Sequence, residues 1–291
     1  MNVLVTGSTG FLGGAICRLL HRAGHTVTGL GRRPSCPADV SSYLSGDLLD
    51  DAFLDAVAQA VGQVDAVVHA AACISYDPQM ESRLMMTNII GTQKTAALAR
   101  RLGAKQIVFL SSIPVIGKPR FHPVTEEHPL HPETAYHVSK LAAELLLQAG
   151  TLPAMILRVP APVGIGMDPG TILPVLVSRC LAGKALQIYG QGSRIQTYLA
   201  AEDIARAVEL ALAHGGSGLF LLPGEAISNA DLARLCRQVT GSASPIMLGT
   251  VPDPHDGETW DISGEKAAAE LGFVPQISLR SVIRTLAGNQ V

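Results

Sequence analysis

Three glycines that follow a short apolar segment near the N-terminus constrain the fold more than any other feature. Gly7, Gly10 and Gly13 have the spacing GxxGxxG. They lie between residues 3–5, a candidate strand, and residues 12–23, where apolar residues recur with a helical period. In a strand–turn–helix unit, the first glycine permits the tight turn, the second lets the main chain approach a phosphate, and the third lets helix and strand pack closely. The pattern therefore predicts a dinucleotide site with phosphates at the helix N-terminus, and disfavours an ordinary glycine-rich turn.

The first half of the chain continues to alternate short apolar segments with helical ones. Continuous apolar strands separated by helices are typical of a parallel sheet with both faces covered. We therefore predict an α/β fold with a doubly wound parallel sheet, the Rossmann arrangement. Candidate strands cover residues 3–5, 26–30, 66–70, 105–110 and 154–157, and candidate helices cover residues 12–23, 81–102 and 134–148.

After residue 160, proline and glycine become more frequent and the alternation weakens. We expect one helix with a polar start over residues 228–239 and a final helix after Ser263. These features predict a smaller C-terminal subdomain that binds the substrate. The predicted division is a dinucleotide-binding domain over residues 1–160 with a return segment near 197–224, and a substrate-binding subdomain over 161–196 and 225–291.

The composition argues against several functions. The 22 Lys and Arg residues are balanced by 24 Asp and Glu residues, a formal charge of −2, so there is no basic excess for a nucleic acid. The five cysteines form no CxxC pair, which argues against a zinc site or a disulfide scaffold and favours a reducing compartment. No apolar run reaches the ~18 residues of a membrane span, and a signal peptide is not expected. We expect a soluble cytoplasmic protein without a metal, a nucleic-acid partner or a membrane anchor.

The end of the second strand predicts which dinucleotide binds. An acidic residue there binds the ribose 2′-hydroxyl of NAD. This chain has Gly31-Arg32-Arg33 instead, and guanidinium groups pair well with a 2′-phosphate. We therefore favour NADP(H) over NAD(H), although two arginines can also simply solvate a loop. Asp47, after a third short strand, is a candidate acceptor for the adenine amino group or a helix N-cap.

A tyrosine and a lysine have the spacing YxxxK at the start of an amphipathic helix. Tyr136 and Lys140 share one helix face and lie about 6 Å apart along its axis. A phenol with a pKa of roughly 10 is a poor base at neutral pH, and a nearby ammonium stabilises its phenolate. Ser111 and Ser112 end an apolar strand, at the edge where an open parallel sheet binds ligands. This arrangement favours acid–base chemistry.

Five segments of the chain carry motifs that occur together in one family. They are TGxxGxxG at residues 6–13, HAAA at 69–72, NxxGT at 88–92, SSxxVxG at 111–117 and YxxSK at 136–140. With this set the chain resembles the extended short-chain dehydrogenase/reductases, the NAD(P)-dependent epimerase/dehydratase family, over nearly its whole length. Ile116 departs from the family pattern SSxxVYG, which has a tyrosine there.

The resemblance implies a catalytic role for four matching residues. Tyr136 would be the general acid/base, and Ser112 would hydrogen-bond the substrate oxygen. Lys140 would bind the ribose and lower the pKa of Tyr136. Asn88 would order the site by bonding main chain or water. A hydride would move between the nicotinamide and a carbinol or carbonyl carbon while Tyr136 exchanges the hydroxyl proton.

Two neighbours of these residues are expected to point elsewhere. Ser111 should face the opposite side of its strand from Ser112, and His137 should face another part of its helix.

The implied cofactor-binding residues are Gly7, Thr9, Gly10, Phe11, Leu12, Gly13, Arg32, Arg33, Asp47, Leu48, Ala70, Ala71, Tyr136 and Lys140.

The substrate is less constrained, because the chain departs from the family at two positions. Many nucleotide-sugar enzymes have an asparagine where this chain has Ala161, and the phosphate-binding arginine position is Gln196. Arg194 would lie on the same side of an extended strand as Gln196. With Ser112, these three are the predicted substrate-binding residues, and Asp203 is expected to cap the next helix.

We expect an oxidoreductase or epimerase that acts on a nucleotide-linked sugar. The alternative is an NADPH-dependent reductase of a small ketone or aldehyde, and a non-catalytic NADP-binding regulator is a third possibility. Family members often pair through the long helices, here residues 81–102 and 134–148, so a homodimer is expected. Burial against the sheet explains the apolar faces of these helices equally well.

Overall fold

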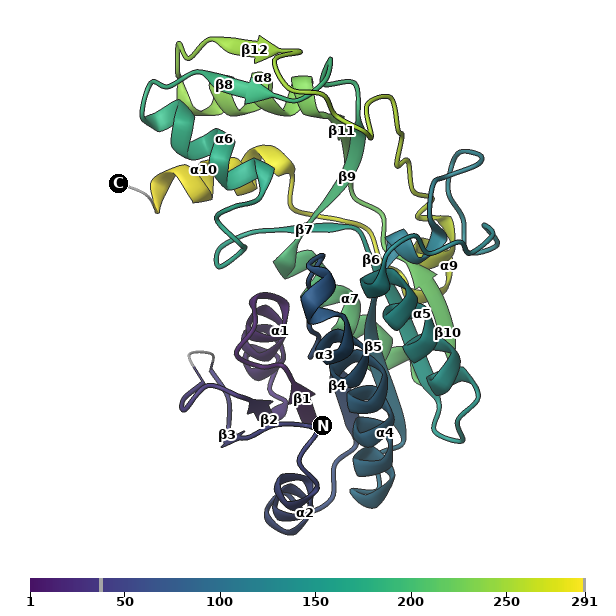
Figure 1. The fold of residues 1–291 in the computed structure, drawn as a ribbon. Helices are drawn as coiled ribbons and strands as arrows, with labels where there is room; N and C mark the ends of the chain where they lie inside the picture. The colour runs from purple at the N-terminus through teal and green to yellow at the C-terminus, as the bar shows by residue number, and fades with distance from the viewer. Residues whose placement is uncertain (37–38, 290–291) are drawn as a thin grey trace.

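Seven parallel strands form the central sheet of the computed structural model, which describes residues 1–36 and 39–289 (Figure 1). The strand order is β10-β6-β5-β4-β1-β2-β3, and every neighbouring pair is parallel. The predicted doubly wound parallel sheet is confirmed. The strands are β1 (Asn2–Thr6), β2 (Thr26–Gly31), β3 (Ser42–Ser45), β4 (Ala66–His69), β5 (Gln106–Ser112), β6 (Ala154–Val159) and β10 (Gly218–Leu221).

Helices cover both faces of this sheet, which is why its strands are almost continuously apolar. Alternate residues of β1 show the two faces: Val3 and Val5 belong to one buried cluster and Leu4 to another. The first cluster lies under α1 (Phe11–Arg22), α7 (Ala201–His214) and α9 (Glu265–Leu271). The second lies under α2 (Asp51–Ala60), α4 (Gly91–Arg101) and α5 (Ala135–Gln148).

The predicted helix over residues 81–102 is interrupted by a π-helical turn. It consists of α3 (Glu81–Met85), the π turn η2 (Met86–Ile90) and α4, preceded by a short 3₁₀ turn, η1 (Pro78–Met80). A π turn inserts an extra residue into a helix and often occurs at a functional site. Here it places Asn88 in the interior, with 2% of its surface exposed.

A smaller unit lies beyond the carboxyl ends of the central strands (Figure 1). It has a three-stranded sheet, a two-stranded sheet and three helices that enclose a third apolar core. Its elements are β7 (Ala161–Val163), β8 (Leu186–Ile188), β9 (Ile195–Ala200), β11 (Glu225–Ser228), β12 (Ile246–Leu248), α6 (Ile172–Leu181), α8 (Asn229–Thr240) and α10 (Leu279–Gly288).

The C-terminal part differs from the expectation of one final helix after Ser263. Two helices are present, α9 and α10, because Gly272 ends α9 in the left-handed region and Pro275 follows. Residues of α9 join the core of the central sheet, while α10 packs in the smaller unit. The division into two domains stays a prediction. Within residues 225–291, which were assigned to the substrate-binding subdomain, α9 lies on the central sheet.

None of the helices in the described part of the chain is both long and apolar enough to span a membrane.

Candidate active site

The glycine loop between β1 and α1 brings main chain unusually close to main chain. Gly7 has a φ of +70°, and a Cβ there would lie 2.7 Å from Cα of Ala71. A Cβ on Gly13 would lie 2.0 Å from the carbonyl oxygen of Gly7, so only glycine allows this packing of helix on strand. Gly10 caps α1 without a side-chain hydrogen bond, which leaves N–H groups of the first turn free for an anion. The loop therefore fits the phosphates of a dinucleotide.

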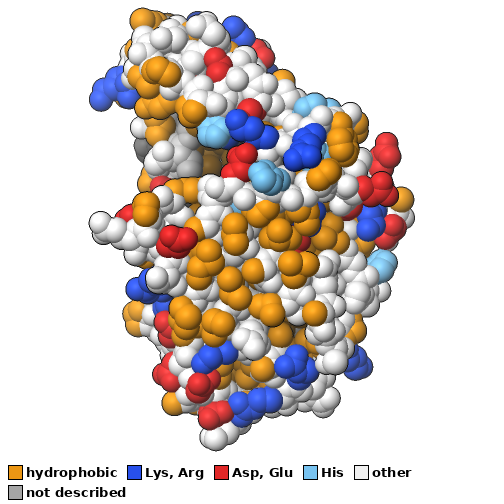
Figure 2. All heavy atoms as spheres, turned by 45° about the vertical axis from the view of Figure 1, so that its right-hand side comes forward, with side chains coloured by type: hydrophobic (Ala, Val, Ile, Leu, Met, Phe, Trp, Pro, Cys, Tyr) orange, Lys and Arg blue, Asp and Glu red, His pale blue; other side chains and the backbone are white. Residues whose placement is uncertain are grey.

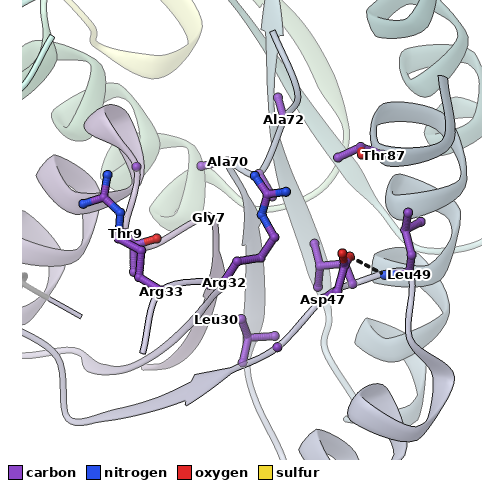
Figure 3. A pocket seen from close by; sticks show the side chains of 15 residues that line it. Gly7, Thr9, Leu30, Arg32, Arg33, Asp47, Leu49, Ala70, Ala72 and Thr87 are labelled. Carbon is purple, nitrogen blue, oxygen red and sulfur yellow. Dashed lines mark hydrogen bonds between the residues drawn. The ribbon is translucent and has the colours of Figure 1, made fainter. Parts of the chain in front are cut away.

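A cavity of about 460 Å³ opens beside this loop, at the carboxyl ends of β1 to β4 (Figure 3). Its volume lies in the range of cofactor sites. Of the predicted cofactor-binding residues, it is lined by Gly7, Thr9, Gly10, Arg32, Arg33, Asp47, Leu48, Ala70 and Ala71. The cavity is also lined by residues that are not among the predicted ones: Leu30, Gly31, Gly46, Leu49, Ala72 and Thr87.

Most of the missed residues are immediate chain neighbours of predicted ones at strand ends, so extending each motif by one residue would have found them. Thr87 lies in the π turn directly before Asn88, so the same extension of the motif at residues 88–92 would have found it. Five predicted residues do not line the cavity itself: Phe11, Leu12, Gly13, Tyr136 and Lys140.

Two arginines reach this cavity directly after β2. Arg32 extends across it, and Arg33 lies on the same wall of the cavity (Figure 3). Neither side chain forms an ion pair within residues 1–36 and 39–289. The Arg33 carbonyl accepts hydrogen bonds from Tyr43 Oη (2.6 Å) and Ser45 Oγ (2.8 Å), which fixes this segment against β3. Two guanidinium groups are thus available to an anionic ligand.

Asp47 is not the N-cap of α2. That role belongs to Asp50, whose Oδ1 accepts from the Ala52 N–H at 2.9 Å. Asp47 is exposed on the rim of the cavity, and its Oδ1 accepts from the Leu49 N–H at 3.0 Å (Figure 3). An acceptor role toward adenine stays a prediction.

A buried histidine ties the glycine loop to the π turn. The Thr92 hydroxyl donates to the Asn88 carbonyl at 2.6 Å, so it accepts from His69 Nε2 at 2.9 Å. His69 Nδ1 therefore accepts from the Thr6 hydroxyl at 2.7 Å, which assigns the tautomer from the network. Thr6 in turn accepts from the Ala71 N–H at 3.3 Å. Burial, reinforced by the charge of Lys140, lowers the pKa of His69 to about 3 and keeps the ring neutral.

Asn88 connects the β4 loop to the helix that carries the tyrosine. Its amide accepts from the Cys73 N–H (2.7 Å) and donates to the Cys73 carbonyl (2.9 Å) and to Ser139 Oγ (2.9 Å). Ser139 Oγ donates to the carbonyl of Tyr136 at 2.7 Å. The predicted main-chain contacts of Asn88 are therefore present, and its catalytic importance stays a prediction.

Tyr136 and Ser112 come together where α5 begins and β5 ends. The phenol is 8% exposed. Burial raises the pKa of Tyr136 above its ordinary value, the neighbouring Tyr76 reinforces this, and the nearby hydroxyl of Ser112 acts against it. Without ligands, this phenol is therefore a proton donor. Lys140, which is expected to lower the pKa of Tyr136, is not among the groups that shift this pKa in the structure.

Lys140 lies deep under this pair. Its Nζ donates to the Leu110 carbonyl at 2.7 Å and lies 4.5 Å above the centre of the Phe109 ring. Burial lowers the pKa of Lys140 to about 8, and the negative charge of Glu144 opposes this. The amine is therefore still largely protonated at neutral pH.

His137, expected to face another part of its helix, has its ring close to that of Tyr136. The two ring centres are 5.6 Å apart, and both rings meet the ring of Tyr76 edge-on, at 6.4 Å from Tyr136 and 6.3 Å from His137. The loop after β4 folds over the first turn of α5 and brings Tyr76 there. Partial burial raises the pKa of Tyr76, and the charge of Arg194 lowers it, so Arg194 lies within electrostatic reach of this ring.

As predicted, the side chains of Arg194 and Gln196 lie on the same side of the extended chain. With the Gln196 amide oriented to donate to Tyr198 Oη at 2.9 Å, its oxygen accepts from Arg194 Nη2 (2.9 Å) and Nε (3.1 Å). Alternate residues at the start of β9 thus present a guanidinium, an amide and a phenol on one side. Ala161 pairs with Tyr198 in the adjacent strand β7.

The prediction that Asp203 caps α7 is wrong. Ala200 is the N-cap, and Asp203 lies within the first turn. Its carboxylate accepts from the N–H groups of Gln276 and Ile277 and from Arg206 Nη1 at 2.6 Å. Asp203 therefore anchors the segment that precedes α10.

Comparison with known proteins identifies the family. The NAD dependent epimerase/dehydratase family matches residues 3–220, about three quarters of the chain. The chain belongs to this family. The predicted membership, and with it the prediction of an enzyme of this type, is confirmed.

Three relatives show how far the likeness extends. The dTDP-glucose 4,6-dehydratase of Streptomyces antibioticus is 27% identical over 300 residues, 95% of this chain and 88% of that protein. The UDP-glucose 4-epimerase of Halalkalibacterium halodurans is 29% identical over 95% of this chain and 91% of its own. A UDP-glucose 4-epimerase from Stenotrophomonas maltophila, solved with NAD and formylated UDP-arabinopyranose, has a TM-score of 0.88 and 26% identity, over 100% of this chain and 98% of that one. Members of this family thus align with both units of the chain.

The neutral His69 makes folding sensitive to acid. Its pKa is about 3 in the folded state and 6.5 ordinarily, so below pH 6.5 the unfolded chain takes up a proton that the folded chain does not. We expect this residue to lower the free energy of unfolding by up to about 1.4 kcal/mol per pH unit as the pH falls. Urea denaturation between pH 7 and pH 4 should show a shallower loss for His69→Gln. The exposed control His21→Gln should keep the wild-type slope, and equal slopes for all three proteins would contradict the assignment.

Proposed function

We propose that the chain transfers a hydride between a nicotinamide cofactor and a hydroxyl or keto carbon of a nucleotide-linked sugar, as an NAD(P)-dependent oxidoreductase or epimerase. The observation that carries this proposal is the placement of Ser112, at the end of β5, next to Tyr136, in the first turn of α5, at the carboxyl edge of the sheet. Parallel sheets bind their ligands at this edge. The Asn88 bonds connect this pair to the wall of the dinucleotide cavity.

Each residue of the pair has a defined task toward the sugar oxygen. A bound nicotinamide dinucleotide supplies or accepts the hydride. Tyr136 donates its proton when a carbonyl is reduced and accepts one when a hydroxyl is oxidised. Ser112 hydrogen-bonds the same oxygen. Lys140 holds the ribose and offers its positive charge to the phenolate, which burial alone disfavours.

The preference for a nucleotide-linked sugar rests on the relatives and on β9. The relatives named above act on dTDP-glucose or UDP-glucose, and the comparisons do not support the alternative of a small-ketone reductase. Arg194 offers a guanidinium to a diphosphate although Gln196 occupies the usual position. A non-catalytic regulator would have no use for the Ser112–Tyr136 pair.

Replacing the phenol tests the chemistry. Tyr136→Phe keeps the ring and removes the exchangeable proton, so we expect turnover of UDP- or dTDP-hexoses to fall by roughly 10²–10⁴-fold. Turnover is measured by product analysis together with absorbance at the reduced nicotinamide band. The exposed Tyr189→Phe is the matched control and should turn over like the wild type. Unchanged turnover in Tyr136→Phe would remove the basis of the proposal.

Nucleoside diphosphates test the substrate class. With NADPH present, UDP or dTDP should raise the melting temperature, because each supplies the diphosphate that Arg194 would bind. Arg194→Ala should weaken this binding by about 10–100-fold, the usual loss for a charge-assisted contact. The exposed Arg284→Ala should leave it unchanged. No stabilisation by either diphosphate would argue for a different substrate.

NADP(H) is the proposed cofactor form. Arg32 and Arg33 support it, since both lie at the cavity without an ion pair in the described residues, and Gly31 ends β2 where NAD enzymes have an acid. The solved relative described above contains NAD, so this chain would differ from it. A preference for NADP(H) favours net reduction over epimerisation, because an epimerase regenerates its bound cofactor.

Separate titrations test this choice. NADPH should bind more tightly than NADH, and Arg32→Ala should weaken NADPH binding by about 10–100-fold because a 2′-phosphate contact is lost. NADH binding should change by less than about threefold. Quenching of protein fluorescence reports both, with the exposed Arg100→Ala as control. Tighter binding of NADH to the wild type would overturn the preference.

We also propose a homodimer through the face that carries α4 and α5. Figure 2 shows hydrophobic side chains gathered on this face, and Val138, Leu145 and Leu146 of α5 are among the exposed ones. An exposed apolar patch of this kind marks an interaction surface. Sedimentation velocity checks the assembly, and a monomeric wild type would refute it.

The cytoplasmic location stays a prediction from the unpaired cysteines.

A further inference from the structure

A buried ion pair joins α5 to β6 next to the strand end that carries Ser112. Glu144 of α5 and Arg158 of β6 form two contacts, Nη2 to Oε2 at 2.8 Å and Nε to Oε1 at 3.1 Å, with side chains 1% and 3% exposed. The Ser111 hydroxyl donates to the same Glu144 oxygen as Arg158 Nε. Ser111 and Arg158 are cross-strand partners, so both reach the helix from one face of the sheet. The carboxylate thus connects α5 to β5 and β6.

Glu144 continues the four-residue spacing of Tyr136 and Lys140. Tyr136, Lys140 and Glu144 follow one another at intervals of four, so they lie along one face of α5. Lys140 is 4% exposed and has the Leu110 carbonyl and the Phe109 ring as its own partners. Neither partner carries a charge. A compensating charge for the buried ammonium comes from Glu144, one turn further along the same face of α5.

We propose that Glu144, held by Arg158 and Ser111, is a positioning residue that keeps Lys140 protonated and fixed against β5. The inference rests on the proposed function only for the task that Lys140 then performs. A buried ammonium without an opposite charge releases its proton readily. Loss of that proton would remove the charge that stabilises the Tyr136 phenolate.

The other groups around Lys140 do not supply this charge. His69 of β4 is neutral, and Tyr136 of α5 is protonated. Arg158 of β6 is positive and contacts Glu144 itself. Among these groups, Glu144 alone is negative. Its replacement by an uncharged amide should therefore favour the neutral amine.

Direct titration of the lysine tests this inference without any substrate. The chain has six lysines, few enough to follow individually by NMR of ¹³C-labelled lysine side chains, and Lys140→Met identifies the signal. In the wild type this signal should titrate near pH 8. In Glu144→Gln, which keeps the shape but replaces one acceptor oxygen with an amide nitrogen, the midpoint should move down by roughly 1 pH unit. The exposed Glu270→Gln should leave it unchanged.

A second variant covers the case in which Glu144→Gln does not fold. The double variant Glu144→Gln/Arg158→Met removes the guanidinium that would be left unpaired, and it should show a smaller downward shift, because a positive charge is removed as well. A wild-type midpoint in either folded variant overturns the inference, as does an equal shift in Glu270→Gln. The titration needs no turnover. A failure of the proposed reaction therefore does not affect this test, and the two failures can be told apart.

Discussion

The rest of the site depends on the close contact of main chain with main chain around the first loop. Gly7 lies against Ala71, and Gly13 lies against the carbonyl of Gly7, at distances that no side chain tolerates. This contact sets how far α1 sits from the sheet and leaves the helix N-terminus open. The cavity, the arginines at its edge and the hydrogen bonds of Thr6 all depend on this placement.

The second level of organisation comes from hydrogen bonds that run between elements. His69 joins β1 to the first turn of α4, Asn88 joins the π turn to α5, and Glu144 joins α5 to β5 and β6. All three side chains are buried, so their polar groups have lost their hydrogen bonds to water. Each group therefore depends on its partners within the protein. The position of Tyr136 is the common outcome of these contacts.

The sequence predicted the sheet well because its strands are buried on both faces and the glycine spacing admits one local geometry. It predicted Ser112, Tyr136 and Lys140 as neighbours through the strand end and the helical repeat. It did not reveal the π turn, since no residue in 86–90 marks an inserted residue. The position of His137 beside Tyr76 depends on how the loop after β4 folds back, and the raised pKa of Tyr136 depends on burial, which only the packed structure shows.

The π turn has a consequence for how this chain tolerates changes in length. Each residue of an α-helix turns the chain by about 100°. Deleting one residue within 86–90 would let α3 and α4 join as one regular helix, but every side chain on one side of the deletion would then rotate by that angle relative to the other. Asn88 and Thr92 would no longer meet their partners together, so a shortened and more regular helix would dismantle the site that the irregular one assembles.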